Sequence, residues 1–160
     1  MTKVVAYIGL GSNLQTPILQ LQSARNAIKE MDAIEEISFS SLYRSPPMGP
    51  QDQPDYVNAV MGIHTTLEAL AILSAMQQIE NEQGRVRSQR WGARTLDIDI
   101  LLYGDKQIRL AELTVPHIGI KERAFVLYPL FEIAPNLVID NQKLIDMVNA
   151  CPLNGVERIA

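Results

Sequence analysis

Alternating apolar and acidic side chains near the middle of the chain constrain its fold more than any other feature. The run TLDIDILLY from Thr95 to Tyr103 predicts a strand, on which successive side chains point to opposite faces. Asp97 and Asp99 would share one face, about 6 to 7 Å apart along the strand. An unpartnered ionised carboxylate is costly to bury, so that face must meet solvent, a cation or an arginine. The opposite face, packed on a core, would carry Leu96, Ile98, Ile100 and Leu102.

The same alternation is typical of any half-exposed strand, so the aspartates alone do not establish a functional site. The residues before them favour one. Four arginines and Trp91 lie between Gly84 and Leu96 with no acidic residue among them, although the chain has 18 acidic against 14 basic side chains. Guanidinium groups suit phosphate oxygens and paired carboxylates suit Mg²⁺, so the segment indicates phosphoryl transfer rather than a solvated loop.

Apolar periodicity elsewhere predicts the element order strand, helix, strand, strand, helix, strand. The other expected strands are Val4–Leu10, Ile37–Tyr43 and Tyr56–Thr65; the helices begin at Thr16–Pro17 and at a capping box formed by Thr65 and Glu68, the second running to about Glu82. Further helical stretches are expected near 121–132 and from about Lys143. This order is typical of a ferredoxin-like βαββαβ antiparallel sheet with helices packed on it, which C-terminal additions would complete as a three-layer α/β/α sandwich.

Length and charge narrow the class of protein. The 160 residues, 47% hydrophobic, predict a single domain over residues 1–160, and the net charge of -4 argues against a nucleic-acid or membrane-surface binder. Cys151 is the only cysteine, which excludes a disulfide framework and favours a reducing compartment. The apolar start Val4–Leu10 is too short to span a bilayer. We therefore expect a cytoplasmic protein, and a monomer.

Two smaller patterns were weighed for ligand binding. Gly9 and Gly11 lie at the end of a predicted strand, but Leu14 stands where a dinucleotide fingerprint needs its third glycine, so we exclude that motif. Tyr56 and Asn58 lie two apart on a predicted strand, so an aromatic ring and an amide would point the same way. This pair is either one wall of a binding site or ordinary cross-strand packing.

Several short motifs resemble, in order, those of the 6-hydroxymethyl-7,8-dihydropterin pyrophosphokinase family. They are Gly11–Leu14, Tyr43–Gly49, Gln53–Asn58, Arg90–Leu101 and Thr114–His117. The resemblance extends from about Tyr7 to Pro135 and implies a ferredoxin-like α/β sandwich. It also implies transfer of the β,γ-pyrophosphoryl unit of ATP to the hydroxymethyl oxygen of the dihydropterin, leaving AMP, in tetrahydrofolate biosynthesis.

The resemblance implies roles for the metal and for ATP. Asp97 and Asp99 would hold two Mg²⁺ ions and act in catalysis together with Arg85 and Arg94. In the ATP set, Gln77 and Glu80 would face the nucleoside, and other members would face the phosphates. The segment from Gly84 to Gly92 would close over ATP as a lid. The full ATP set is Gln77, Glu80, Arg85, Arg87, Trp91, Arg94, Ile100, Thr114, His117 and Arg123.

For the second substrate, the resemblance implies a pterin held between Tyr56 and Phe125, with Asn58 reading its amide edge. A flat ring with donors and acceptors suits two aromatic faces and one amide. The pterin set is Ser45, Pro46, Met48, Tyr56, Asn58, Trp91, Asp97 and Phe125. The expected partners are thus two small molecules, ATP and the hydroxymethyl-dihydropterin, with no nucleic acid and no membrane.

Two other functions stay open on the residues alone. Ferredoxin-like sheets with exposed aromatics and basic loops can stack RNA bases, although the acidic chain and the two aspartates argue against that reading. The site would also suit a metal-dependent nucleotidyl or phosphoryl transferase with another acceptor. The product of the reaction distinguishes these possibilities.

Overall fold

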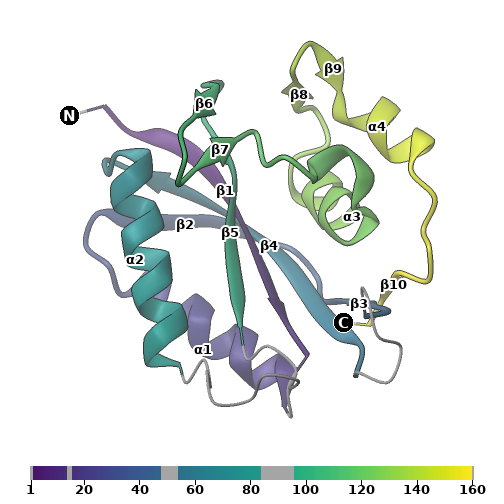
Figure 1. Ribbon diagram of the computed structural model, residues 1–160, viewed down its shortest axis with the longest axis horizontal. Coiled ribbons are helices and arrows are strands. Elements are labelled where there is room, and N and C mark those ends of the chain that lie inside the picture. Colours follow the sequence, from purple (N-terminus) through teal and green to yellow (C-terminus); the bar gives the residue numbers. More distant parts are fainter. Residues whose placement is uncertain (1, 14–15, 48–53, 84–95, 160) are drawn as a thin grey trace.

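An antiparallel sheet of six strands runs through the described part of the chain, which comprises residues 2–13, 16–47, 54–83 and 96–159 (Figure 1). In this computed structural model, β1 pairs with β4 on one side and β5 on the other; β2 and β3 both pair with β4, and β10 extends the sheet beyond β3. The strands are β1 (Val4–Ser12), β2 (Ile34–Phe39), β3 (Tyr43–Ser45), β4 (Tyr56–Thr65), β5 (Asp97–Tyr103) and β10 (Glu157–Arg158).

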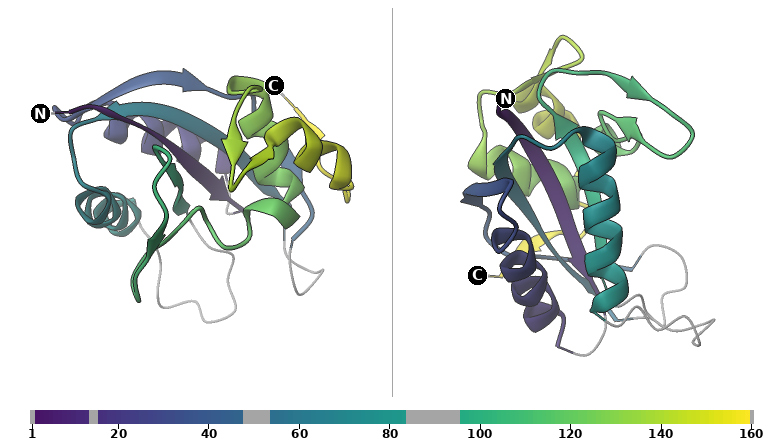
Figure 2. Two further views of the ribbon diagram at one scale, coloured as in Figure 1. Left: turned by 90° about the horizontal axis from the view of Figure 1, so that it is seen from above. Right: turned by 90° about the vertical axis from the view of Figure 1, so that its left-hand side faces the viewer.

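Helices cover the sheet on both faces (Figures 1 and 2). The helices α1 (Pro17–Lys29) and α2 (Ala69–Glu82) pack on one face, and α3 (Ala124–Ile133) and α4 (Leu144–Ala150) on the other. A 3-10 turn η1 (Ile120–Glu122) precedes α3, and two hairpins join β6 (Ile108–Arg109) to β7 (Thr114–Val115) and β8 (Val138–Ile139) to β9 (Gln142–Lys143). Within the described ranges, no helix is long and apolar enough to cross a bilayer.

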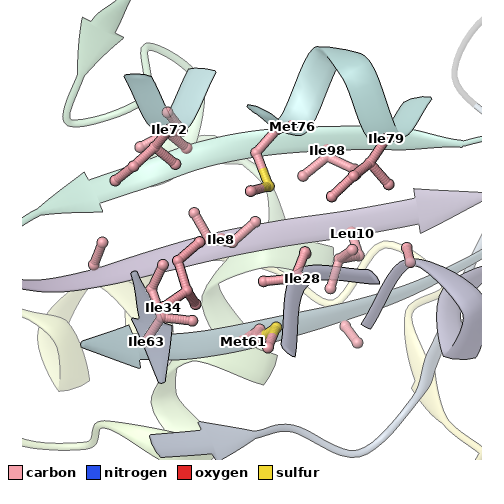
Figure 3. Packing of buried hydrophobic residues seen from close by; sticks show 14 of the residues in the cluster. Ile8, Leu10, Ile28, Ile34, Met61, Ile63, Ile72, Met76, Ile79 and Ile98 are labelled. Carbon is pink, nitrogen blue, oxygen red and sulfur yellow. The ribbon is translucent and has the colours of Figure 1, made fainter. Parts of the chain in front are cut away.

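The face beneath α1 and α2 forms the larger core (Figure 3). Each helix buries an apolar stripe at spacings of three and four residues, as an amphipathic helix does. These stripes pack against the side chains at alternate positions of the strands, which point toward the helices. Each element thus presents one apolar face, at a period of 3.6 residues on the helices and of 2 residues on the strands. Completely or nearly completely buried members include Ile8, Leu21, Ile28, Met61, Ile63, Ile72, Met76, Ile79 and Ile98.

The other face is covered only in part. Helices α3 and α4 pack Leu127, Leu130 and Leu144 against Val60 and Leu101 of the sheet, forming a second core. On this face, the ends of β1, β4 and β5 that carry Gly11, Asn58 and Asp97 border a pocket next to the start of α3. In the described chain, the second core formed with α3 and α4 does not extend over these three residues. This uncovered end of the sheet is where a ligand can reach the strands.

The predicted strand Ile37–Tyr43 is wrong in its extent, because the chain forms two strands, β2 and β3. An extra residue interrupts the pairing with β4 between Glu36 and Ser38. Further on, the Ser40 hydroxyl accepts the Val60 N–H at 2.9 Å, where a ladder carbonyl would otherwise serve. Such bulges bend an edge strand, and here the bend redirects β3 along the far half of β4.

A second irregularity corrects the predicted face of Leu102. The pairing of β1 with β5 shifts between Tyr7 and Ile8, so that Leu101 is an extra residue on β5. Asp97 and Asp99 keep the predicted alternation, but beyond the bulge Leu102 packs in the second core with Leu101.

The predicted capping box at the start of α2 is also wrong. The helix begins at Ala69 and its first turn has no side-chain cap. Thr65 is instead the last residue of β4; its hydroxyl donates to Ala33 O and accepts the Leu67 N–H. The hydroxyl therefore closes the turn after the strand and cannot cap the helix.

A cluster around Glu132 joins α3 to the β2–β3 bend. Its carboxylate accepts hydrogen bonds from Ser41 N at 3.1 and 3.0 Å, from Ser41 Oγ at 3.0 Å and from Tyr43 Oη at 2.6 Å. Burial alone would raise the pKa of Glu132, but these hydrogen bonds and the charge of Arg158 outweigh burial and hold the pKa below its usual value. The ionised form is therefore part of the folded structure.

We expect Glu132→Gln to lower the free energy of unfolding at pH 7 by about 0.5 to 1.5 kcal/mol, since an amide nitrogen cannot accept the donors that the lost oxygen accepted, and solvent screens this exposed carboxylate. A carboxyl group whose pKa is lower in the folded than in the unfolded protein stabilises the folded state fully at pH values above its unfolded pKa, which is about 4.3 for glutamate. That stabilisation is lost as the pH falls through the pKa of the folded state. Urea unfolding should therefore show the gap between wild type and variant narrowing from pH 5 downward. Glu122→Gln on η1 is the exposed control; a gap independent of pH would contradict the role of the ionised Glu132.

Candidate active site

A pocket lies on the uncovered end of the sheet and encloses about 690 Å³, counting space open to solvent. Its walls come from β1, β3, β4, β5 and the start of α3, so residues distant in the sequence converge there. The lining includes Ser45, Pro46, Tyr56, Asn58, Asp97, Asp99, Arg123 and Phe125.

Two glycines of β1 lie opposite the two carboxylates of β5. In the register of β1 and β5, Gly11 lies opposite Asp97 and Gly9 opposite Asp99. A Cβ on Gly11 would stand 3.0 Å from Asn58 Oδ1, so a side chain there would crowd the amide. Glycine thus keeps the floor of the pocket open beside the aspartates. Both glycines line the pocket.

The polar end of the pocket is fixed by Asn58 and Ser45, both buried. Asn58 Nδ2 donates to Ser45 Oγ at 2.8 Å, which leaves Asn58 Oδ1 as an acceptor. The aromatic side chains Tyr56 and Phe125 line the same pocket from β4 and α3. The pocket can therefore hold a flat ring that presents N–H donors to Asn58.

A second hollow of about 620 Å³, counting open space, adjoins the first and shares Asp99 with it. Its lining combines the apolar Leu73 and Ile100 with Thr114 and His117. His117 is brought beside β5 because its backbone N–H donates to Leu101 O at 3.0 Å. Asp99 is thus placed between the two hollows.

The local backbone orients the His117 ring. Gly119 N donates to Nδ1 at 3.1 Å, so the neutral ring carries its proton on Nε2 and can donate it to an anion. Burial lowers the pKa of His117; Asp99 opposes this and Arg123 adds to it, with a net lowering that favours the neutral ring. The Arg123 guanidinium lies 5.9 Å from the centre of the Phe125 ring. A cation and a neutral donor therefore flank Asp99.

The two predicted nucleoside residues on α2 lie elsewhere. Gln77 is exposed, and neither Gln77 nor Glu80 is in the lining of either hollow. Glu80 is only 8% exposed, and its Oε2 accepts the Ile98 N–H at 2.8 Å. The contact of Glu80 is therefore with the strand that carries the aspartates.

Five predicted residues lie outside the described part of the chain, together with the proposed lid from Gly84 to Gly92. They are Met48, Arg85, Arg87, Trp91 and Arg94. Every other member of the predicted pterin set lines the first pocket, and Ile100, Thr114 and His117 of the ATP set line the second hollow. Arg123 lines the first.

Comparison with known sequences shows the family to which this chain is similar. Residues 7–135 match the family described as 7,8-dihydro-6-hydroxymethylpterin-pyrophosphokinase (HPPK). A Haemophilus influenzae protein named 2-amino-4-hydroxy-6-hydroxymethyldihydropteridine pyrophosphokinase is 55% identical over 142 residues, 89% of each chain. A Pseudomonas aeruginosa protein of the same name is 48% identical over 154 residues, covering 96% of this chain and 95% of its own.

Solved structures share the fold at low sequence identity. The Plasmodium falciparum HPPK-DHPS wild-type structure with pteroate superposes with a TM-score of 0.75 at 14% identity, over 93% of this chain. An HPPK-DHPS structure in complex with substrates gives 0.73 at 13% identity, over 92%. This chain spans 42% and 45% of those two longer chains.

Proposed function

The chain belongs to the 7,8-dihydro-6-hydroxymethylpterin-pyrophosphokinase family, and from this premise we propose how its own residues perform the reaction. The enzyme transfers pyrophosphate from ATP to the hydroxymethyl group of 6-hydroxymethyl-7,8-dihydropterin, a step of folate biosynthesis. The observation that carries the proposal is the position of Asp99, which borders both an aromatic and amide-lined pocket and a second hollow beside His117.

The first pocket binds the pterin in this proposal. Tyr56 and Phe125 supply apolar ring faces, and Asn58, whose Nδ2 is held by Ser45, directs Oδ1 to N–H groups of the pterin. Pro46 completes the wall on that side. A hydroxymethyl group on the ring would then point toward Asp97 and Asp99, which border the same space.

The second hollow binds ATP. Ile100 and Thr114 line the part that suits a base, and His117 can donate its Nε2 proton to a phosphate oxygen. Arg123 adds a cation that faces the first pocket, so the transferred group would lie between the two substrates. Arg85 and Arg94 are proposed to assist from the segment between α2 and β5, and Gln77, Arg87 and Trp91 to contact the nucleotide.

The donor set fits magnesium that arrives with ATP. Within the described ranges no group of three histidine, cysteine or acidic side chains could hold a metal by itself. Mg²⁺ usually takes one or two carboxylates and completes its shell with water and substrate phosphates. We propose that Asp97 and Asp99 hold two Mg²⁺ ions, which would offset the negative charge of the phosphates.

The bonds made and broken follow from this arrangement. The hydroxymethyl oxygen bonds to the β-phosphorus of ATP and loses its proton, while the bond from that phosphorus to the α,β-bridging oxygen breaks. The bridging oxygen keeps the electron pair of the broken bond and leaves as part of AMP. The protein contributes positioning and charge: Asn58 and the two rings orient the acceptor, and His117 and Arg123 orient the donor.

We also propose the finer description of the molecule. The strand order, with two helices on each face, supports a ferredoxin-like βαββαβ core completed as a three-layer α/β/α sandwich in one domain. The net charge of -4 supports action on small molecules rather than nucleic acid, and we propose a cytoplasmic monomer.

A product assay tests the proposed function. With ATP, Mg²⁺ and 6-hydroxymethyl-7,8-dihydropterin, we expect equal amounts of AMP and pterin diphosphate, resolved by ion-exchange chromatography. In separate reactions, a label on the β-phosphate of ATP and a label on the γ-phosphate should each appear in the pterin diphosphate. Release of ADP would show single phosphoryl transfer and refute the proposal, and salt-sensitive RNA binding without ATP or metal would instead favour an RNA-binding module.

A further inference from the structure

We propose that Glu80 is a positioning residue that fixes the strand between the two metal-binding aspartates. The inference rests on the proposed function, in which Asp97 and Asp99 hold Mg²⁺. It assigns Glu80 a task different from the nucleoside contact that the family resemblance implies.

The first step is the place of β5 in the sheet. It is the last strand in the order β10-β3-β4-β1-β5, so within the described ranges one of its edges has no strand partner. The N–H of Ile98, between the two aspartates, donates to Glu80 Oε2 at 2.8 Å. A side chain of α2 therefore supplies the acceptor that a further strand would provide.

The second step is the rigidity of the support. Glu80 lies in the last turn of α2, next to Ile79 and one turn after Met76, both buried in the larger core with Ile98 itself. A hydrocarbon side chain could fill this position without the cost of burying a carboxylate. The hydrogen bond to the Ile98 N–H is therefore a contribution that the carboxylate makes and a hydrocarbon could not.

The third step links this bond to the metal. The bonded N–H belongs to the peptide unit between Asp97 and Ile98, so Glu80 limits rotation of the backbone that carries one aspartate relative to the other. Two carboxylates that bind ions jointly depend on their separation and direction. Hydrogen bonds that orient metal ligands from behind typically contribute about 10- to 100-fold to metal affinity or activity.

The test compares Glu80→Ala and Glu80→Gln with wild type, using Mn²⁺ as a magnetic probe with a non-hydrolysable ATP analogue. We expect Glu80→Ala to weaken Mn²⁺ binding, measured by electron paramagnetic resonance, by about 10- to 100-fold. Amide hydrogen exchange at Ile98, followed by NMR, should accelerate at least about tenfold. Glu80→Gln keeps an acceptor oxygen and should restore most of both properties. Glu82→Ala, exposed on the same helix, is the control and should change neither.

Three outcomes separate the possibilities. Unchanged Ile98 exchange and Mn²⁺ affinity in Glu80→Ala overturn the inference. A loss of ATP affinity that disappears when 3′-deoxy-ATP replaces ATP, with normal Mn²⁺ binding, also overturns it and favours the nucleoside contact. If Asp97→Asn and Asp99→Asn leave Mn²⁺ binding unchanged, the proposed metal role fails; accelerated Ile98 exchange in Glu80→Ala would then still show that Glu80 fixes the strand.

Discussion

Asp99→Asn will lower kcat/KM for ATP by about 10³-fold, equivalent to about 4 kcal/mol of transition-state stabilisation. Asp99 is exposed and borders both hollows, so in our proposal its charge acts on the metal and phosphates rather than on folding. Asparagine keeps the size of the side chain but removes the negative charge. Surface substitutions of this kind usually change the free energy of unfolding by less than about 0.5 kcal/mol.

Steady-state kinetics at several Mg²⁺ concentrations, with thermal unfolding of the same samples, measures this effect. Asp105→Asn is the matched control, because Asp105 is exposed in the turn after the same strand and lines neither hollow. A variant Asp99→Asn that keeps more than roughly a tenth of wild-type kcat at saturating Mg²⁺ would refute the metal role of this residue.

Local patterns predicted two of the strands that line the pocket. Tyr56–Thr65 was predicted with the bounds of β4, and Asp97 and Asp99 lie on one face of β5 as expected. β4 is buried over nearly its whole length, so its sequence signal is a mostly apolar run, whereas the shared face of the two aspartates follows from the period-2 alternation that a single sequence displays. The helices α1 and α2 were found for the same reason, since their buried stripes have helical spacing.

Irregular pairing could not be predicted in the same way. The extra residue at Leu101 and the break between β2 and β3 are properties of two paired strands, and neither strand alone indicates the register. The sequence therefore predicted one strand where two exist, and placed Leu102 on the wrong face.

Contacts between distant residues set much of the site. Glu80 bonds a backbone group 18 positions later, and Glu132 bonds Ser41 across 91 positions. Gly9 and Gly11 were considered for a dinucleotide motif, but both lie within β1 and face the aspartates. A glycine inside a strand is a sequence signal of close approach to the backbone, and applying it would have found this part of the pocket.

Asn58→Leu will lower kcat/KM for the pterin by about 10³-fold or more, while the Kd for ATP changes by less than about threefold. Leucine is similar in size and suits a buried position on β4, but it offers no acceptor to the pterin N–H groups. Sites that hydrogen-bond a ligand lose most when a buried polar group is left unpaired. Kinetics with the pterin varied, and ATP binding by calorimetry, separate the two effects. Asn26→Leu on the exposed face of α1 is the control for the substitution itself.

The hydrogen bond from Asn58 to Ser45 adds a sharper test of this role. Ser45→Ala removes the group that orients the amide, so we expect a loss of about tenfold in kcat/KM for the pterin, with ATP binding unchanged. If Ser45 acts only through Asn58, adding Ser45→Ala to Asn58→Leu should cost little more than Asn58→Leu alone, because coupled residues are not additive. Fully additive losses would mean that Ser45 contacts the pterin independently. An unchanged KM for the pterin in Asn58→Leu would show that this amide does not read the substrate.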